Sequence, residues 1–176
     1  MGHKVLIVVD MQNDFISGAL GSAEAQDIVS KVVKKIQTFE GSIYYTLDTH
    51  EENYLKTQEG THLPVPHCIE GTEGWQLAPD IIAARPITAE HVYCKGQFGS
   101  VELAEDLRDF NDMEGIDSIE LVGLCTDICV VSNAMLLKAF LPEVPVTVDA
   151  SCCAGVTTES HEAALTTMKA CQIIVK

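Results

Sequence analysis

The chain has 176 residues, which is enough for one compact domain with its own hydrophobic core, so we expect residues 1–176 to form a single domain. Its 26 acidic and 11 basic residues give a formal net charge of −15, which argues against binding to nucleic acid or to anionic membranes. The first apolar run is too short for a signal peptide or a membrane span, and the seven cysteines are scattered, so we expect a cytoplasmic protein with reduced thiols.

Apolar runs alternate with segments of helical period along the chain. Strands are predicted at residues 4–9, 42–47, 90–94, 118–122, 144–148 and 171–175, and helices at residues 22–39, 76–84, 101–113, 127–140 and 159–170. Residues 51–75 have no clear period and predict a long loop, and such a loop inside a compact domain usually carries function. The alternation predicts an α/β fold with an open, mostly parallel six-stranded sheet and helices on both faces.

Chemically active side chains follow the carboxyl ends of the predicted strands. Asp10 follows the first strand, Asp48 and His50 follow the second, Lys95 follows the third, and a turn at residues 123–129 follows the fourth. Ligands of open α/β sheets bind at this edge. We therefore expect these segments to converge on one cleft.

The turn at residues 123–129, with the sequence GLCTDIC, joins a predicted strand to a predicted helix. Cys129 would lie in the first helical turn, where the helix dipole and unpaired N–H groups favour an anion, so we expect its thiol to be biased towards thiolate. The backbone N–H groups of Cys125 and Cys129 would form an oxyanion hole during attack on a carbonyl. Asp10 would take the thiol proton, and Lys95 would hold the thiolate.

A second group of side chains has the composition of a metal site. Asp48 and His50 lie two residues apart after a strand, and the long loop contains Glu59, His62 and His67. Carboxylates and imidazoles together suit zinc, iron or manganese. The alternative is that these are ordinary polar residues on a surface loop.

Taken in order, these motifs resemble those of the isochorismatase-like cysteine hydrolases, and more narrowly the nicotinamidase/pyrazinamidase branch. The matching segments are DMQNDF at residues 10–15, DTH at 48–50, PHCIEGT at 66–72, Lys95, and GLCTDICV at 123–130. They span essentially the whole chain. The resemblance implies an isochorismatase-like, Rossmann-like three-layer α/β/α fold.

The resemblance also implies roles for individual residues. The catalytic triad would be Asp10, Lys95 and Cys129, and three of the metal ligands would be Asp48, His50 and His67. Some members of the family use a glutamate as the remaining ligand, which corresponds to Glu59, and others use a histidine, which makes His62 the rival candidate. The implied cofactor is one divalent transition metal, with zinc preferred over iron or manganese. A cis peptide bond is implied between Leu124 and Cys125.

The implied reaction is hydrolysis of nicotinamide to nicotinate and ammonia through a cysteine thioester, as in NAD salvage, with pyrazinamide as a further substrate. Phe15, Phe98 and Trp75 are the aromatic residues near the motifs that would contact the flat ring. The expected partner is this small molecule, with no nucleic acid and no membrane, and the family suggests a homo-oligomer.

Two other functions fit parts of the pattern. One is a metal-free hydrolase of the same superfamily, acting on another small amide or carbamoyl compound, against which Asp48, His50 and His67 argue. The other is a thiol redox or zinc-binding protein without turnover, in which Cys125 and Cys129 would form a redox pair. Loss of ammonia release after substitution of Asp10 or Lys95 would exclude this last function.

Overall fold

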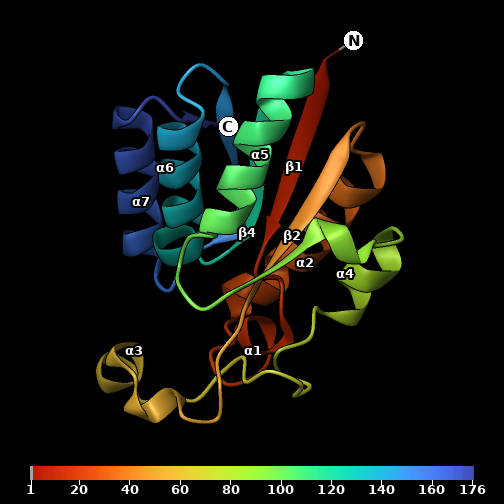
Figure 1. Ribbon diagram of the computed structural model, residues 1–176. Helices are drawn as coiled ribbons and strands as arrows, with labels where there is room; N and C mark the ends of the chain where they lie inside the picture. The colour runs from red at the N-terminus through yellow and green to blue at the C-terminus, as the bar shows by residue number, and fades with distance from the viewer. Residues whose placement is uncertain (1) are drawn as a thin grey trace.

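The computed structural model describes residues 2–176, and its centre is a six-stranded sheet in which neighbouring strands are parallel (Figure 1). The strands are β1 (His3–Val9), β2 (Ser42–Asp48), β3 (Val92–Lys95), β4 (Ile116–Leu124), β5 (Val146–Ala154) and β6 (Ile174–Val175). Their order across the sheet is β3-β2-β1-β4-β5-β6. The chain therefore winds outward in both directions from the middle, and the crevice between the carboxyl ends of β1 and β4 is where such sheets bind ligands.

Helices cover both faces of this sheet (Figure 1). One face is covered by α2 (Ala23–Thr38) and α4 (Pro79–Ala84), and the other by α5 (Val101–Glu114), α6 (Val131–Phe140) and α7 (Thr158–Ala170). The predicted α/β fold, with its six strands and two helical layers, is confirmed. Among residues 2–176, every helix is either too short or too polar to span a lipid bilayer.

The side chains of β1 divide the core into two halves. Val5, Ile7 and Val9 pack against α5, α6 and α7, whereas Leu6 and Val8 pack against α2 and α4. All five are at most 1% exposed. A strand that is buried on both faces has to be apolar throughout, and this accounts for the unbroken apolar run near the start of the chain.

The segment predicted as a long loop contains two short helices. A 3₁₀ turn at Tyr54–Lys56 leads into α3 (Gln58–His62), and this arm stands away from the body of the molecule (Figure 1). The side chain of Thr57 caps α3 by accepting a hydrogen bond of 3.0 Å from Gly60 N–H. The prediction of a long loop at residues 51–75 missed these two elements, because helices this short show no hydrophobic period.

Several predicted boundaries also differ. The strand predicted at 144–148 runs from Val146 to Ala154, and the strand predicted at 171–175 is reduced to Ile174–Val175, because Cys171 N–H still bonds to the end of α7. The helices predicted at 76–84 and 127–140 begin later, the second of them after a π-helical turn at Thr126–Val130. A 3₁₀ turn occupies the beginning of the predicted strand 90–94, and the short helix α1 (Asn13–Ile16) was not predicted.

Candidate active site

Three side chains from different strand ends meet at the carboxyl edge of the sheet. Asp10 follows β1, Lys95 ends β3, and Cys129 lies in the π-helical turn after β4. Lys95 Nζ is 2.7 Å from Asp10 Oδ2 and 3.5 Å from Cys129 Sγ. The three residues are 0%, 2% and 4% exposed, respectively. An acid, an amine and a thiol are thus held together out of bulk water.

Asp10 is held from both sides and still has an oxygen available for a proton. Thr46 Oγ1 donates a hydrogen bond of 2.6 Å to Asp10 Oδ1, whereas Oδ2 pairs with Lys95 but receives no well-directed hydrogen bond from the described residues. Burial raises the pKa of the Asp10 carboxyl, the Lys95 ammonium opposes the rise, and the Asp48 carboxylate adds to it. A raised pKa suits a group that takes up and returns a proton.

The electrostatics of Cys129 correct one expectation. Burial raises the pKa of the Cys129 thiol well above its usual value, and the Asp10 carboxylate adds to the rise, while Lys95 offsets only part of it. The expected bias towards thiolate was therefore wrong, because desolvation outweighs the nearby ammonium. Burial at this position therefore favours the neutral thiol over the thiolate.

The turn that carries Cys129 has an unusual backbone. The peptide bond between Leu124 and Cys125 is cis, which confirms that expectation, and Cys125 C=O accepts hydrogen bonds from Ile128 N–H and Val130 N–H at 3.1 and 3.0 Å. Cys125 N–H donates to no acceptor among the residues that the structure describes. Just before the turn, Gly123 has a φ of 117°, and a Cβ there would lie 2.1 Å from Val9 O. Only glycine lets β4 approach β1 this closely.

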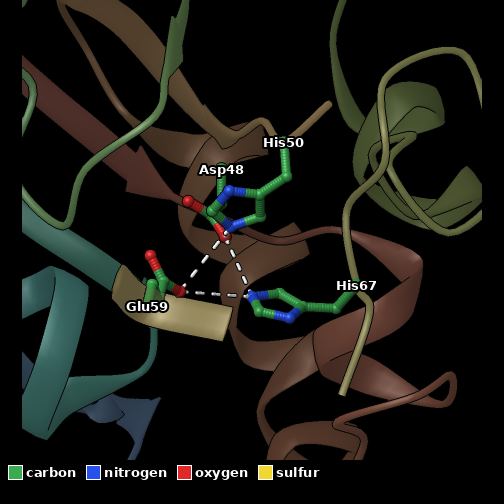
Figure 2. Close-up of side chains that lie close together, drawn as sticks. All are labelled: Asp48, His50, Glu59 and His67. Carbon is green, nitrogen blue, oxygen red and sulfur yellow. Dashed lines mark hydrogen bonds and ion pairs between the residues drawn. The ribbon is translucent and has the colours of Figure 1, made fainter. Parts of the chain in front are cut away.

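Four potential metal ligands lie next to this group, since Asp48 Oδ1 is 3.6 Å from Lys95 Nζ. One donor atom each from Asp48, His50, Glu59 and His67 lies within 4.8 Å of the other three (Figure 2). Asp48 Oδ2 is 3.0 Å from His50 Nε2 and 3.3 Å from His67 Nε2, and Glu59 Oε1 is 3.6 and 3.7 Å from the same two nitrogens. Two carboxylates and two imidazoles facing one point are a donor set that fits a divalent transition metal.

Neighbouring groups orient these ligands. His67 Nδ1 lies 2.8 Å from Val65 C=O, so its N–H donates there and Nε2 is left to face the cluster. The fully buried Gln12 accepts from Asp48 N–H and donates to Asp48 C=O, both at 2.8 Å. The pKa of the Asp48 carboxyl lies well below its usual range, because hydrogen bonds from His50 and His67 outweigh the effect of burial.

The rival ligand His62 lies outside this cluster, although it lines the same cavity as Glu59 and His67. Its ring nitrogen Nδ1 is 2.9 Å from Gln58 C=O within α3, and the residue is exposed. Among the described residues, the cluster of ligand atoms contains Glu59 and not His62. The geometry therefore favours the glutamate alternative.

A cavity of about 530 Å³ connects the thiol with the potential ligands. Cys129, Asp48, Glu59 and His67 line one part of it, and most of the remaining lining is apolar. Of the three aromatic candidates, Phe15 and Phe98 line the cavity. The third does not: Trp75 is partly buried and packs against the core, and its Nε1–H donates a hydrogen bond of 2.9 Å to Thr49 Oγ1.

Comparison with known proteins connects this geometry to a family. The family model described as "Isochorismatase domain" matches residues 4–175. The nicotinamidase/pyrazinamidase of Mycobacterium tuberculosis is 27% identical over 146 residues, which cover 74% of this chain and 76% of that protein.

Two solved structures of similar proteins have the same fold as this chain. The crystal structure of the pyrazinamidase of Pyrococcus horikoshii in complex with zinc is similar at a TM-score of 0.80 and 28% identity, covering 99% of this chain and 98% of the other. The crystal structure of the nicotinamidase/pyrazinamidase of Bacillus subtilis is similar at a TM-score of 0.82 and 28% identity, covering 98% of each chain.

Proposed function

The chain belongs to the isochorismatase family of hydrolases, and on this premise we propose that it is a metal-dependent nicotinamidase, which converts nicotinamide to nicotinate and ammonia and also cleaves pyrazinamide. One observation carries the proposal: Cys129 Sγ lies 3.5 Å from Lys95 Nζ in the same cavity that Asp48, Glu59 and His67 line. A thiol nucleophile and an ion site that share a cavity suit a flat substrate with an amide at one end and a ring nitrogen at the other.

The proposed first half of the reaction makes a thioester. Asp10 takes the proton from Cys129 Sγ as the sulfur attacks the carboxamide carbon, and Lys95 stabilises the negative charge that develops on the sulfur. The N–H groups of Cys125 and Cys129 donate to the carbonyl oxygen as it becomes an oxyanion. Asp10 then gives its proton to the amide nitrogen, the C–N bond breaks, and ammonia leaves.

The proposed second half releases nicotinate. Asp10 takes a proton from a water molecule, whose oxygen attacks the thioester carbon, and the same N–H groups stabilise the second oxyanion. The C–S bond breaks, and the proton held by Asp10 returns to Cys129 Sγ. The raised pKa of Asp10 suits both transfers, because the group has to be protonated and deprotonated once in each half.

Asp48, His50, Glu59 and His67 would hold the metal, for which we propose zinc, with iron and manganese as alternatives. When bound, such an ion supplies a Lewis-acid position that can accept a pyridine nitrogen. Phe15 and Phe98 line the cavity and would contact the ring. Trp75 would affect substrate binding only indirectly. Its hydrogen bond holds Thr49, which directly precedes the ligand His50 in the chain.

The same proposal extends to the domain organisation of the enzyme and to its location in the cell. Residues 1–176 would form one hydrolase domain, in keeping with a single sheet that contains the strands of the described chain. All seven cysteines are free, although Cys152 and Cys153 are adjacent. Free thiols are the usual state in a reducing compartment, which supports a cytoplasmic location.

Removal of the proposed nucleophile tests the function. Wild-type protein loaded with zinc should release ammonia from nicotinamide, and Cys129→Ala should lower kcat/KM about a thousandfold or more, because no covalent intermediate can form. Cys94→Ala is the matched control, since Cys94 is exposed on β3, and it should retain the wild-type rate. Full activity of Cys129→Ala would exclude the proposed nucleophile. Wild-type protein that hydrolyses another small amide, but not nicotinamide, would favour the metal-free alternative.

The metal site is tested by comparing Glu59 and His62, which both lie on α3. Elemental analysis should find one transition metal per chain in the wild type and in His62→Gln, because His62 lies outside the cluster. Glu59→Gln should weaken metal affinity by at least about tenfold in chelator competition, since it replaces an anionic ligand with a neutral amide. Loss of metal from His62→Gln, with Glu59→Gln unaffected, would reverse the assignment.

A further inference from the structure

Asn133, on α6, joins two segments of the site that are far apart in sequence. Its Oδ1 accepts a hydrogen bond of 2.9 Å from Ser100 N–H, and its Nδ2 donates to Phe98 C=O at 3.2 Å and to Cys129 C=O at 2.8 Å. The residue is 1% exposed. One buried side chain therefore contacts the backbone both of the turn that carries the thiol and of a loop at the rim of the cavity.

That loop, residues 96–100, connects β3 to α5 and follows Lys95 directly. Gly96, Gln97 and Phe98 are exposed, and Phe98 lines the cavity although its side chain is 45% exposed. A loop this open has little packing of its own to fix its position. Its hydrogen bonds to Asn133 are a specific restraint that holds it against the interior.

The chemistry of the three contacts requires an asparagine side chain. A primary amide offers one acceptor oxygen and two N–H donors, and here the oxygen and both donor positions have backbone partners. Aspartate of the same shape keeps the acceptor but has no donor. An apolar residue would remove all three hydrogen bonds, two of which are buried.

We propose that Asn133 is a positioning residue that holds the loop of Phe98 over the cavity, in register with Cys129. Asn133 does not touch the reacting atoms, and it acts on substrate binding through Phe98. The effect on catalysis rests on the proposed function, but the restraint on the loop is a property of the fold and can be measured without any substrate.

Hydrogen exchange tests the restraint directly. Asn133→Ala should speed exchange of the Ser100 amide by about tenfold or more, because it removes the acceptor. The matched control is Asn111→Ala: Asn111 Oδ1 accepts from Ile116 N–H, also at 2.9 Å, at the end of α5, so this variant should speed exchange at Ile116 and not at Ser100. Unchanged exchange at Ser100 in Asn133→Ala would overturn the proposal.

Steady-state kinetics with nicotinamide test whether the restraint matters for the substrate. Asn133→Ala and Phe98→Ala should each raise KM by about tenfold, with a smaller fall in kcat, and the double variant should raise KM no further than either single variant. Asn111→Ala should keep the wild-type KM. Multiplying effects in the double variant, or an unchanged KM in Asn133→Ala, would overturn the action through Phe98. If the wild type does not cleave nicotinamide, the proposed function fails while the exchange result still decides the restraint.

Discussion

Two lysines of this protein each lie between two acidic side chains, yet their surroundings differ. Lys35 Nζ, on α2, is 2.6 Å from Glu120 and 2.7 Å from Asp149, and its side chain is 22% exposed. Lys95 Nζ is 2.7 Å from Asp10 and 3.6 Å from Asp48, and its side chain is 1% exposed. The first cluster keeps contact with water, and the second does not.

The carboxylates of the two clusters show what this difference means. Asp149 Oδ1 accepts hydrogen bonds from Ser151 N–H and Oγ–H at 3.1 and 2.7 Å, and together with Lys35 they lower the pKa of Asp149 against the effect of burial. The pKa of Asp10 is raised despite an equally close lysine, because its burial is complete. Ion pairs of the same length thus accompany a lowered carboxyl pKa at Asp149 and a raised one at Asp10.

Removing the amine from the buried cluster should produce the largest effect on activity. Lys95→Met keeps a side chain of similar length but removes the charge beside Cys129 Sγ, so kcat/KM for nicotinamide should fall about a thousandfold or more. Lys35→Met is the matched control and should retain the wild-type rate. Ammonia release measures the activity of both variants. Comparable activity of Lys95→Met and Lys35→Met would contradict the proposal that the buried cluster, and not the partly solvated one, takes part in catalysis.

Urea unfolding should show that the buried Asp10–Lys95 ion pair makes the fold no more stable than an uncharged pair at the same positions would. Lys95→Met should lose about 3–5 kcal/mol of unfolding free energy, because Asp10 is left buried without its partner. The double variant Asp10→Asn/Lys95→Met should recover this loss and match or exceed the wild type by up to about 4 kcal/mol, while remaining inactive. A double variant as unstable as the single one would mean that the unpaired buried charge of Asp10 is not what destabilises Lys95→Met.

The smallest effect is expected at the partly solvated cluster. Lys35→Met should lower the free energy of unfolding by only about 0.2–1 kcal/mol, because water and salt screen the pair. Unfolding in low salt and in about 1 M salt should show the difference shrinking at high salt. A loss as large as that of Lys95→Met would show that exposure does not separate the two lysines.

Much of the fold and the members of the site could be predicted from the sequence because their signals are local. An apolar run such as residues 5–9 marks a buried strand, and polar residues directly after such runs identified Asp10, Asp48 and Lys95. The raised pKa of the Cys129 thiol could not be predicted in the same way. It depends on how completely the folded chain excludes water, and desolvation proved stronger than the lysine beside it.

The supporting side chains were missed for a related reason. Thr46, Gln12 and Asn133 each form a hydrogen bond to a residue more than 30 positions away in the chain, so no local pattern indicates their partners. Trp75 shows a further limit: its closeness in sequence to a motif predicts ring contact, whereas its partly buried side chain packs against the core and does not line the cavity. Sequence patterns indicate which face a residue occupies, but not which atom it bonds.

Asp10, Lys95 and Cys129 stand at the ends of three separate strands, and β3 reaches β1 only through β2. Domains begin to fold from the end that the ribosome delivers first, so the early strands can associate long before the nucleophile has been synthesised. Even then, the turn around Cys129 still lacks His161 of α7, whose Nδ1 lies 2.8 Å from Thr126 Oγ1. The last helix of the chain thus contacts the turn that carries Cys129, and the geometry of that turn depends on a segment synthesised about thirty residues later.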